Sequence, residues 1–68
     1  MINYSPFFNT IKSKKISQNT LSNEYYVSKN IINKLRKNKP VSLSTLDYLC
    51  KILDCNLNEI VSIHNING

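Results

Sequence analysis

Glycine is almost absent from this chain of 68 residues, since it occurs once, as Gly68. A phosphate-binding loop or a dinucleotide-binding fingerprint needs several glycines at fixed spacing, so both are excluded. Proline occurs only twice. Small β folds depend on turns rich in glycine and proline, whereas helical bundles can dispense with them. These shortages favour an all-α fold.

Cysteine, histidine and acidic residues are also scarce, which limits the available chemistry. The chain has two cysteines, Cys50 and Cys55, one histidine, His64, and four acidic residues. A metal site needs several ligands at fixed spacing, and Cys50, Cys55 and His64 lack such a spacing. Neither a pair of catalytic carboxylates nor a Ser-His-Asp constellation can be assembled from so few groups. We therefore expect no metal site, no cofactor and no enzymatic activity.

Long hydrophobic runs are missing as well. No apolar segment reaches the roughly 18 residues that a membrane-spanning helix requires. The first residues, MINYSP, lack the basic start and apolar core of a signal peptide, and a small secreted protein usually carries several disulfides. We therefore expect a cytoplasmic protein with reduced thiols and no membrane partner. The length suits one domain, with residues 1–68 as a single unit, its core at about 5–63 and a tail at 64–68.

Positive charge dominates the chain and is unevenly distributed. Nine Lys and Arg against four Asp and Glu give a formal net charge of +5. Residues 1–40 carry +7, whereas residues 41–68 carry −2. An excess of positive charge is typical of proteins that bind nucleic acid. Biased codon usage also enriches a chain in lysine and asparagine, but it does not account for the asymmetry. The last third of the chain is better suited to building the core or to self-association.

A repeated pattern marks the beginnings of helices. Ser or Asn at the N-cap accepts a free backbone N–H, and an apolar residue before the cap packs on one four residues into the helix. The pattern occurs four times, as Ile16-Ser17…Leu21, Val27-Ser28…Ile32, Val41-Ser42…Leu46 and Cys55-Asn56…Ile60. A fifth start is indicated by Ser5-Pro6, because proline suits the first helical position. The sequence therefore predicts no strand and five short helices, near residues 6–14, 18–25, 29–37, 43–53 and 57–63.

Both cysteines are expected to have structural roles. Cys50 lies on an apolar stripe of the fourth expected helix, with leucines at positions 43, 46, 49 and 53, and we expect it in the core. Cys55 precedes a helix cap and is expected to be half-buried. A thiol switch has no support in the sequence, because no basic neighbour would lower the pKa of the thiol.

The third expected helix has two chemically different faces. At about 100° per residue, its apolar residues Ile31, Ile32 and Leu35 fall on one side. The opposite side carries only polar and basic residues, namely Lys29, Asn30, Asn33, Lys34 and Lys37, with Arg36 at the border. Lysine can donate to guanine or pair with phosphate, and asparagine can donate to and accept from adenine. This face suits a DNA groove, although an ordinary solvated helix face has the same composition.

The order of these segments resembles that of a known family. The segment QNTLSNEYYVSKNIINKLR, from Gln18 to Arg36, resembles the helix-turn-helix of the Cro and lambda-repressor-like (XRE) DNA-binding domains. The segment VSLSTLDYLCKILDCNLNEIVSI, from Val41 to Ile63, resembles the fourth and fifth helices of that family. The resemblance covers about residues 5–63. It implies an all-α, lambda-repressor-like fold of five short helices, whose second and third form the helix-turn-helix. It also implies binding to double-stranded operator DNA, with the third helix in the major groove.

The resemblance further implies roles for individual residues. The positions that contact bases match Ser28, Lys29, Asn30, Asn33 and Lys34. The positions that contact the sugar-phosphate backbone match Gln18, Lys37, Asn38 and Lys39. Arg36, at the border of the polar face, is a further candidate for a phosphate contact. Gln18 suits this role because the free N–H groups of a helix N-terminus attract the same phosphate.

Two positions depart from the family pattern. Tyr26 stands where the turn usually has glycine, which is used there because the turn needs a positive φ. Ser22 stands where the second helix usually has alanine at a close helix–helix contact. We expect Tyr26 at the surface and Tyr25 in the core.

We therefore expect a sequence-specific regulator of transcription, a repressor, that binds a palindromic operator as a homodimer. The apolar C-terminal residues Ile60, Ile63 and Ile66 are the candidates for the dimer interface, although burial within the monomer is an equal alternative. No small-molecule ligand is implied. The alternative function is a protein-interaction module, such as an antitoxin or an anti-repressor component. A third possible function is non-specific binding of nucleic acid. An interaction module should show apolar or acidic residues where the third helix is basic.

Overall fold

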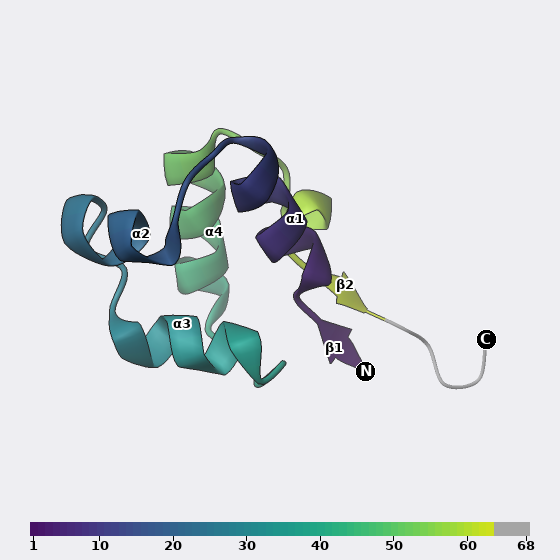
Figure 1. The fold of residues 1–68 in the computed structure, drawn as a ribbon. Coiled ribbons are helices and arrows are strands. Elements are labelled where there is room, and N and C mark those ends of the chain that lie inside the picture. Colours follow the sequence, from purple (N-terminus) through teal and green to yellow (C-terminus); the bar gives the residue numbers. More distant parts are fainter. Residues whose placement is uncertain (64–68) are drawn as a thin grey trace.

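Four α-helices make up most of residues 1–63, the part of the chain that this computed structural model describes. They are α1 (Ser5–Ser13), α2 (Gln18–Glu24), α3 (Lys29–Arg36) and α4 (Leu43–Leu53) (Figure 1). A 3-10 helix, η1 (Leu57–Glu59), and two strands, β1 (Ile2–Asn3) and β2 (Ser62–Ile63), complete the fold. The expected tail, residues 64–68, lies outside the described residues. None of the helices within residues 1–63 is long and apolar enough to span a bilayer.

Serine caps set the beginnings of the three helices that follow α1. Ser17, Ser28 and Ser42 each accept a hydrogen bond from the backbone N–H three residues further on, at 3.1–3.2 Å. The predicted helix starts at residues 18, 29 and 43 are thereby confirmed. At η1, the Glu59 carboxylate accepts from the N–H of Asn56 at 2.8 Å, as in a capping box.

The first helix begins one residue earlier than expected. Its N-cap is Tyr4 rather than Ser5, and Pro6 lies in its first turn. The N–H of Ser5 donates instead to the side-chain oxygen of Asn3, at 2.8 Å. A side chain that precedes the helix therefore satisfies one of the free N–H groups that a serine cap would have satisfied.

The prediction of a fifth helix at residues 57–63 is wrong beyond its first turn. Only Leu57–Glu59 are helical, because Ile60 turns into the core and its carbonyl accepts a hydrogen bond from the N–H of Phe7, at 3.1 Å. The chain then continues as β2, which pairs antiparallel with β1, Ile2 opposite Ile63. The prediction of no strand is also wrong, since strands of two residues are too short to show an alternating pattern. The all-α class holds.

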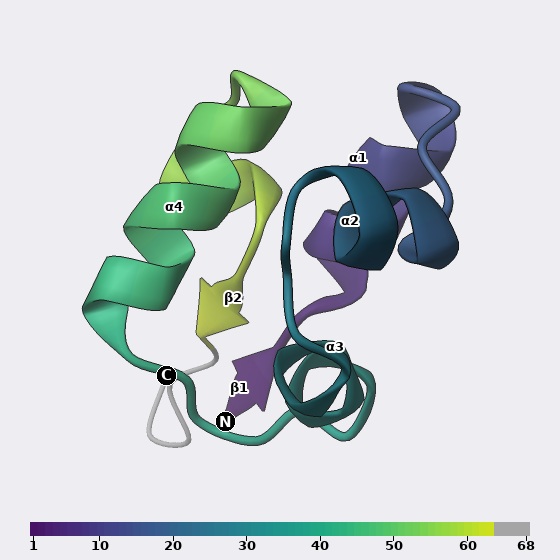
Figure 2. The same ribbon diagram turned by 90° about the vertical axis from the view of Figure 1, so that its left-hand side faces the viewer.

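The core brings together side chains from all four helices and from the segments that flank them. Its members are 5% exposed or less: Tyr4, Phe7, Ile11, Leu21, Val27, Ile32, Leu35, Leu49, Leu53 and Ile60. Leu43 departs from the expected apolar stripe, because it is 74% exposed. The helices surround this core so that α3 lies across one end of the molecule, below α2 and α4 (Figures 1 and 2).

Tyr4 joins the start of the chain to the loop that follows α3. Its backbone N–H donates to the side-chain oxygen of Asn38 at 2.9 Å, and its hydroxyl donates to the carbonyl of Lys39 at 2.9 Å. Burial raises the pKa of the Tyr4 hydroxyl, and a backbone hydrogen bond with Val41 opposes this effect. The phenol therefore stays protonated as a donor, and the loop after α3 is held against the first residues of the chain.

Within residues 1–63, each α-helix is followed by a residue in the left-handed region. Lys15, Tyr26, Asn38 and Asp54 have φ between 51° and 59°. Glycine usually occupies such positions, because a side chain in this conformation costs about 1–2 kcal/mol. Asparagine and aspartate tolerate it better than tyrosine or lysine. The turn between α2 and α3 therefore has the positive φ expected of it, although Tyr26 stands there.

Replacing Tyr26 with glycine is expected to raise the free energy of unfolding by about 0.5–1 kcal/mol. Tyr26 has a φ of 59° and is 85% exposed, so the change relieves strain and removes little packing. Urea titration followed by circular dichroism measures the effect. The control is Tyr26→Ala, which removes the ring but keeps the Cβ atom that causes the strain. An equal gain in both variants would contradict the explanation by strain.

Candidate nucleic-acid interface

The helix-turn-helix is built from α2 and α3, which are joined by residues 25–28. The inward side of α3 is apolar: Ile32 and Leu35 are 5% and 0% exposed, and Ile31 is half-buried. The hydroxyl of Tyr48 on α4 donates to the carbonyl of Tyr25, which ties the turn to α4. The apolar back of α3 is thereby anchored, and its other face is directed away from the core.

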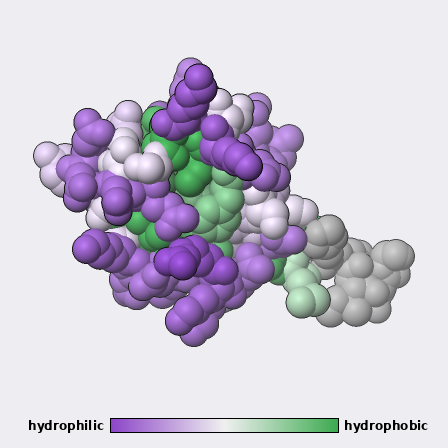
Figure 3. All heavy atoms as spheres, viewed as in Figure 1, coloured by the Kyte–Doolittle hydropathy of each residue, from purple (hydrophilic) through white to green (hydrophobic). Residues whose placement is uncertain are grey.

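This other face consists of basic and amide side chains. Lys29, Asn30, Asn33, Arg36 and Lys37 are exposed, and Lys34 is half-buried. Within residues 1–63, no acidic side chain forms a salt bridge with any of them. Lys51 and Asp47 do form a salt bridge, at 3.0 Å, but both residues lie on α4. Hydrophilic side chains accordingly line the edge of the molecule along which α3 runs (Figure 3). The positive charge of α3 is therefore free to meet an external anion.

Ser28 has a structural role at the start of α3. Its hydroxyl oxygen accepts from the N–H of Ile31 at 3.1 Å. Because a hydroxyl can donate as well as accept, its hydrogen remains available to a base or a phosphate. Ser28 can thus begin the helix and contact DNA at the same time.

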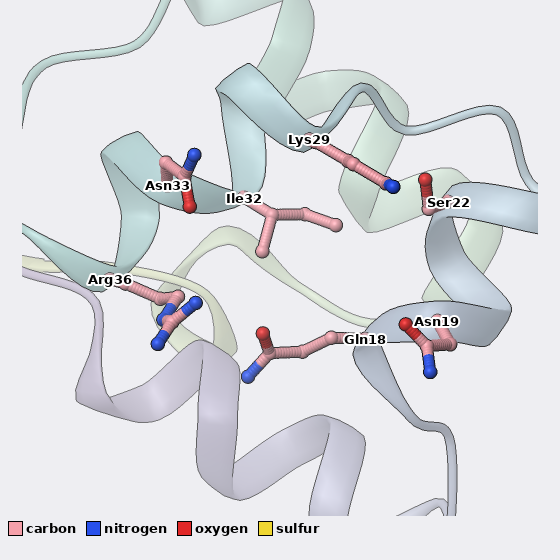
Figure 4. Close-up of a pocket in the computed structure, with 7 residues that line it drawn as sticks. All are labelled: Gln18, Asn19, Ser22, Lys29, Ile32, Asn33 and Arg36. Carbon is pink, nitrogen blue, oxygen red and sulfur yellow. The ribbon is translucent and has the colours of Figure 1, made fainter.

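A shallow pocket of about 200 Å³ lies between α2 and α3. Gln18 and Arg36 extend into it from the two helices, and Lys29 extends toward Ser22 (Figure 4). The lining residues are Gln18, Asn19, Ser22, Lys29, Ile32, Asn33 and Arg36. Most of them can donate a hydrogen bond, which is the chemistry that binds phosphate oxygens. Sequence reasoning missed Asn19, although its position next to Gln18 in the first turn of α2 was a usable signal.

The loop after α3 contains three of the expected phosphate contacts, Lys37, Asn38 and Lys39, and all three are exposed. The side-chain oxygen of Asn38 is already used, because it accepts from the N–H of Tyr4. Its amide NH₂ remains as the donor for a phosphate. Sequence reasoning missed the part that Tyr4 plays in holding this loop, and no local pattern signals a contact over 34 residues.

The expected dimer interface needs a correction. Ile60 is 0% exposed and packs in the core, so it has no surface to offer a partner. Ile63 is 75% exposed, and Ile66 lies outside the described residues. A larger exposed apolar surface lies on α4 and η1, where Leu43 and Leu57 are 74% and 45% exposed. We call it the α4 groove, of about 430 Å³, lined by Leu43, Ser44, Leu46, Asp47, Cys50 and Leu57.

Metal-ligating side chains are dispersed in the part of the chain that the structure describes. Residues 1–63 contain no group of three or more His, Cys, Asp or Glu side chains placed to hold a metal ion.

Comparison with known proteins agrees with this geometry. A model of the Cro/C1-type HTH DNA-binding domain matches residues 9–64, which include all of α2 and α3. The structure is similar to the crystal structure of the transcriptional regulator VanUg, with a TM-score of 0.82 and 28% sequence identity. That similarity covers 90% of this chain and 81% of the other. No curated protein matches the chain. Because the family model spans most of the sequence, the chain belongs to the Cro/C1-type helix-turn-helix DNA-binding domains.

Proposed function

We propose that this protein is a sequence-specific transcriptional regulator, a repressor, that binds double-stranded DNA with α3 in the major groove. The observation that supports this most directly is the exposed face of α3. This face carries both amide side chains and cations that form no salt bridge with an acidic side chain within residues 1–63. Behind it, Ile32 and Leu35 are buried in the core. A groove-reading helix needs this combination, because its outer side chains must be free to bond and its inner ones must fix its orientation.

The positions of the candidate residues support a division of labour. Candidates for base contacts lie on α3 and its cap: Ser28, Lys29, Asn30, Asn33 and Lys34. Candidates for phosphate contacts flank them, at the start of α2 and from the end of α3 onward: Gln18, Arg36, Lys37, Asn38 and Lys39. A protein that clamps the backbone on both sides of a groove fixes the register in which its helix meets the bases. The two sets therefore have complementary roles in the proposed complex.

A single helix of eight residues reads only a short stretch of DNA, so we expect the protein to act as a homodimer on a palindrome. The α4 groove provides an apolar surface for the contact between the two copies, with the exposed Ile63 as a further candidate. Neighbouring exposed apolar side chains are typical of interaction sites. Ile60 has no part in this proposal.

The test is selection of bound oligonucleotides from a random pool, carried out with the wild type and with Asn30→Ala. The wild type is expected to enrich a palindrome. Asn30→Ala is expected to weaken binding by about 1–3 kcal/mol and to relax the preference at one base pair in each half-site. The physical reason is that an exposed amide can bond two atoms of an adenine at once, which alanine cannot do.

The matched control is Lys37→Ala, which is expected to weaken binding to all sequences about equally, because a phosphate contact carries no sequence information. If Asn30→Ala left both affinity and selectivity unchanged, the assignment of base contacts would be wrong. Enrichment of no sequence would instead indicate a non-specific binder, and no binding at all would favour a protein-interaction module.

A further inference from the structure

The end of α4 brings the two cysteines of residues 1–63 close together. After Leu53 the chain turns at Asp54, whose φ is 51°. The N–H of Cys55 then donates to the carbonyl of Cys50 at 3.0 Å, and the N–H of Asp54 donates to the carbonyl of Lys51 at 3.4 Å. This pair of bonds is a Schellman motif, in which a contact between the side chains of the two outer residues is frequent. In this chain the two outer residues are Cys50 and Cys55.

Both thiols are free. The two cysteines are half-buried and unbridged, and the backbone hydrogen bond from Cys55 to Cys50 holds their positions close together. The surrounding backbone is held on both sides, because Leu49, Leu53 and Ile60 are at most 2% exposed. Separation of the backbone at Cys50 from that at Cys55 would require the end of α4 to open.

We propose that Cys50 and Cys55 form a dithiol site that closes reversibly to an intramolecular disulfide by exchange with low-molecular-weight disulfides. One cysteine, as its thiolate, attacks a sulfur of the small disulfide and expels one thiolate. The other cysteine, as its thiolate, attacks the protein sulfur of the mixed disulfide and expels the second. The two expelled thiolates take up the two protons that the cysteines lost. The small disulfide is reduced by two electrons, and the cysteine pair is oxidised by two.

The surroundings of Cys55 make this closure slow at neutral pH. Burial raises the pKa of its thiol, and the neighbouring Cys50 and the Glu59 carboxylate raise it further. The Lys14 ammonium lowers it by less, so the basic neighbour that the sequence did not indicate is present but is outweighed. Because only the thiolate attacks, the rate of closure should rise as the pH is raised toward the pKa of Cys55. The site therefore suits a stable disulfide rather than a fast sensor.

The site is independent of the proposed DNA binding. The C-terminal end of α4 lies at the opposite end of the molecule from α3 (Figures 1 and 2). An experiment on the thiols therefore gives its answer whether or not α3 binds DNA.

The experiment equilibrates the full chain with mixtures of oxidised and reduced glutathione, in buffer and in concentrated urea. Alkylation and mass spectrometry then give the fraction of intramolecular disulfide. We expect the equilibrium constant for closure to be about tenfold or more higher in the folded protein than in urea. The comparison uses one sequence, so it does not depend on a variant folding correctly. Cys55→Ser serves as the control, since it is expected to form only a mixed disulfide with glutathione.

A higher closure constant in the folded protein supports the proposal. The same ratio stabilises the folded state by linkage, so the oxidised protein should also melt at a higher temperature than the reduced one. An equal or lower constant in the folded protein would overturn the proposal, as would glutathione adducts that persist on both cysteines of the folded chain.

Discussion

Replacing Leu49 with alanine is expected to lower the free energy of unfolding by about 2–5 kcal/mol. Leu49 is 0% exposed and lies within α4, facing the core that all four helices share. The change removes buried apolar atoms and leaves a cavity that the neighbouring side chains fill only in part. A core this small rarely supplies more than about 3–5 kcal/mol in total. The variant should therefore be largely unfolded at 25 °C, as judged by urea titration and circular dichroism.

Leu43→Ala is the matched control, because it makes the same chemical change in the same helix. Leu43 is 74% exposed, so its replacement should change the free energy of unfolding of the monomer by no more than about 0.5 kcal/mol. The contrast between the two variants tests the orientation of α4. Similar losses in both would mean that α4 does not face the core as described.

DNA binding is expected to weaken steeply as salt is added. Five cations lie on α3 or in the loop that follows it: Lys29, Lys34, Arg36, Lys37 and Lys39. Each phosphate that a cation neutralises contributes about −0.9 to the slope of log affinity against log salt concentration, so the three cations assigned to phosphates, Arg36, Lys37 and Lys39, give a slope of about −2.7 per protomer. Between 50 and 200 mM salt, this corresponds to a loss of roughly 40-fold. Binding titrations at several salt concentrations measure the slope.

Two substitutions that each remove one positive charge show whether the salt dependence originates at α3 and the loop after it. Lys39→Gln removes a cation from the loop after α3 and should reduce the slope by about 0.9. Lys51→Gln removes one from α4, where Lys51 is paired with Asp47, and should leave the slope unchanged. A slope that responded to Lys51 and not to Lys39 would place the DNA on another face of the protein.

The helix starts at residues 18, 29 and 43 were predictable because their causes are local. A cap bond joins residues three apart, and the apolar contact beside it joins residues five apart. The pattern of Val27, Ser28 and Ile32 therefore contains the information that begins α3. The two faces of α3 were predictable for a similar reason, since 3.6 residues per turn determine which side chains share a side.

The end of the chain was not predictable from the same rules. Ile60 follows a capping pattern, yet it leaves the helix because the N–H of Phe7 bonds its carbonyl. That contact joins residues far apart in sequence, as does the pairing of Ile2 with Ile63. An apolar residue such as Ile60 suits either the core or a partner, and only tertiary packing distinguishes the two. The same limit hid the α4 groove, because the helical stripe placed Leu43 in the core.

The left-handed residues that follow the four helices also have a consequence for the unfolded chain. Residues with a side chain sample fewer backbone conformations than glycine does. The denatured ensemble of this protein is therefore narrower at Lys15, Tyr26, Asn38 and Asp54 than it would be with glycine at those places. Folding therefore loses less conformational entropy at these positions than it would with glycine. This difference favours the folded state by about 0.4–1 kcal/mol at each position and offsets much of the local strain. A nearly glycine-free sequence can in this way form tight corners without a large loss of stability.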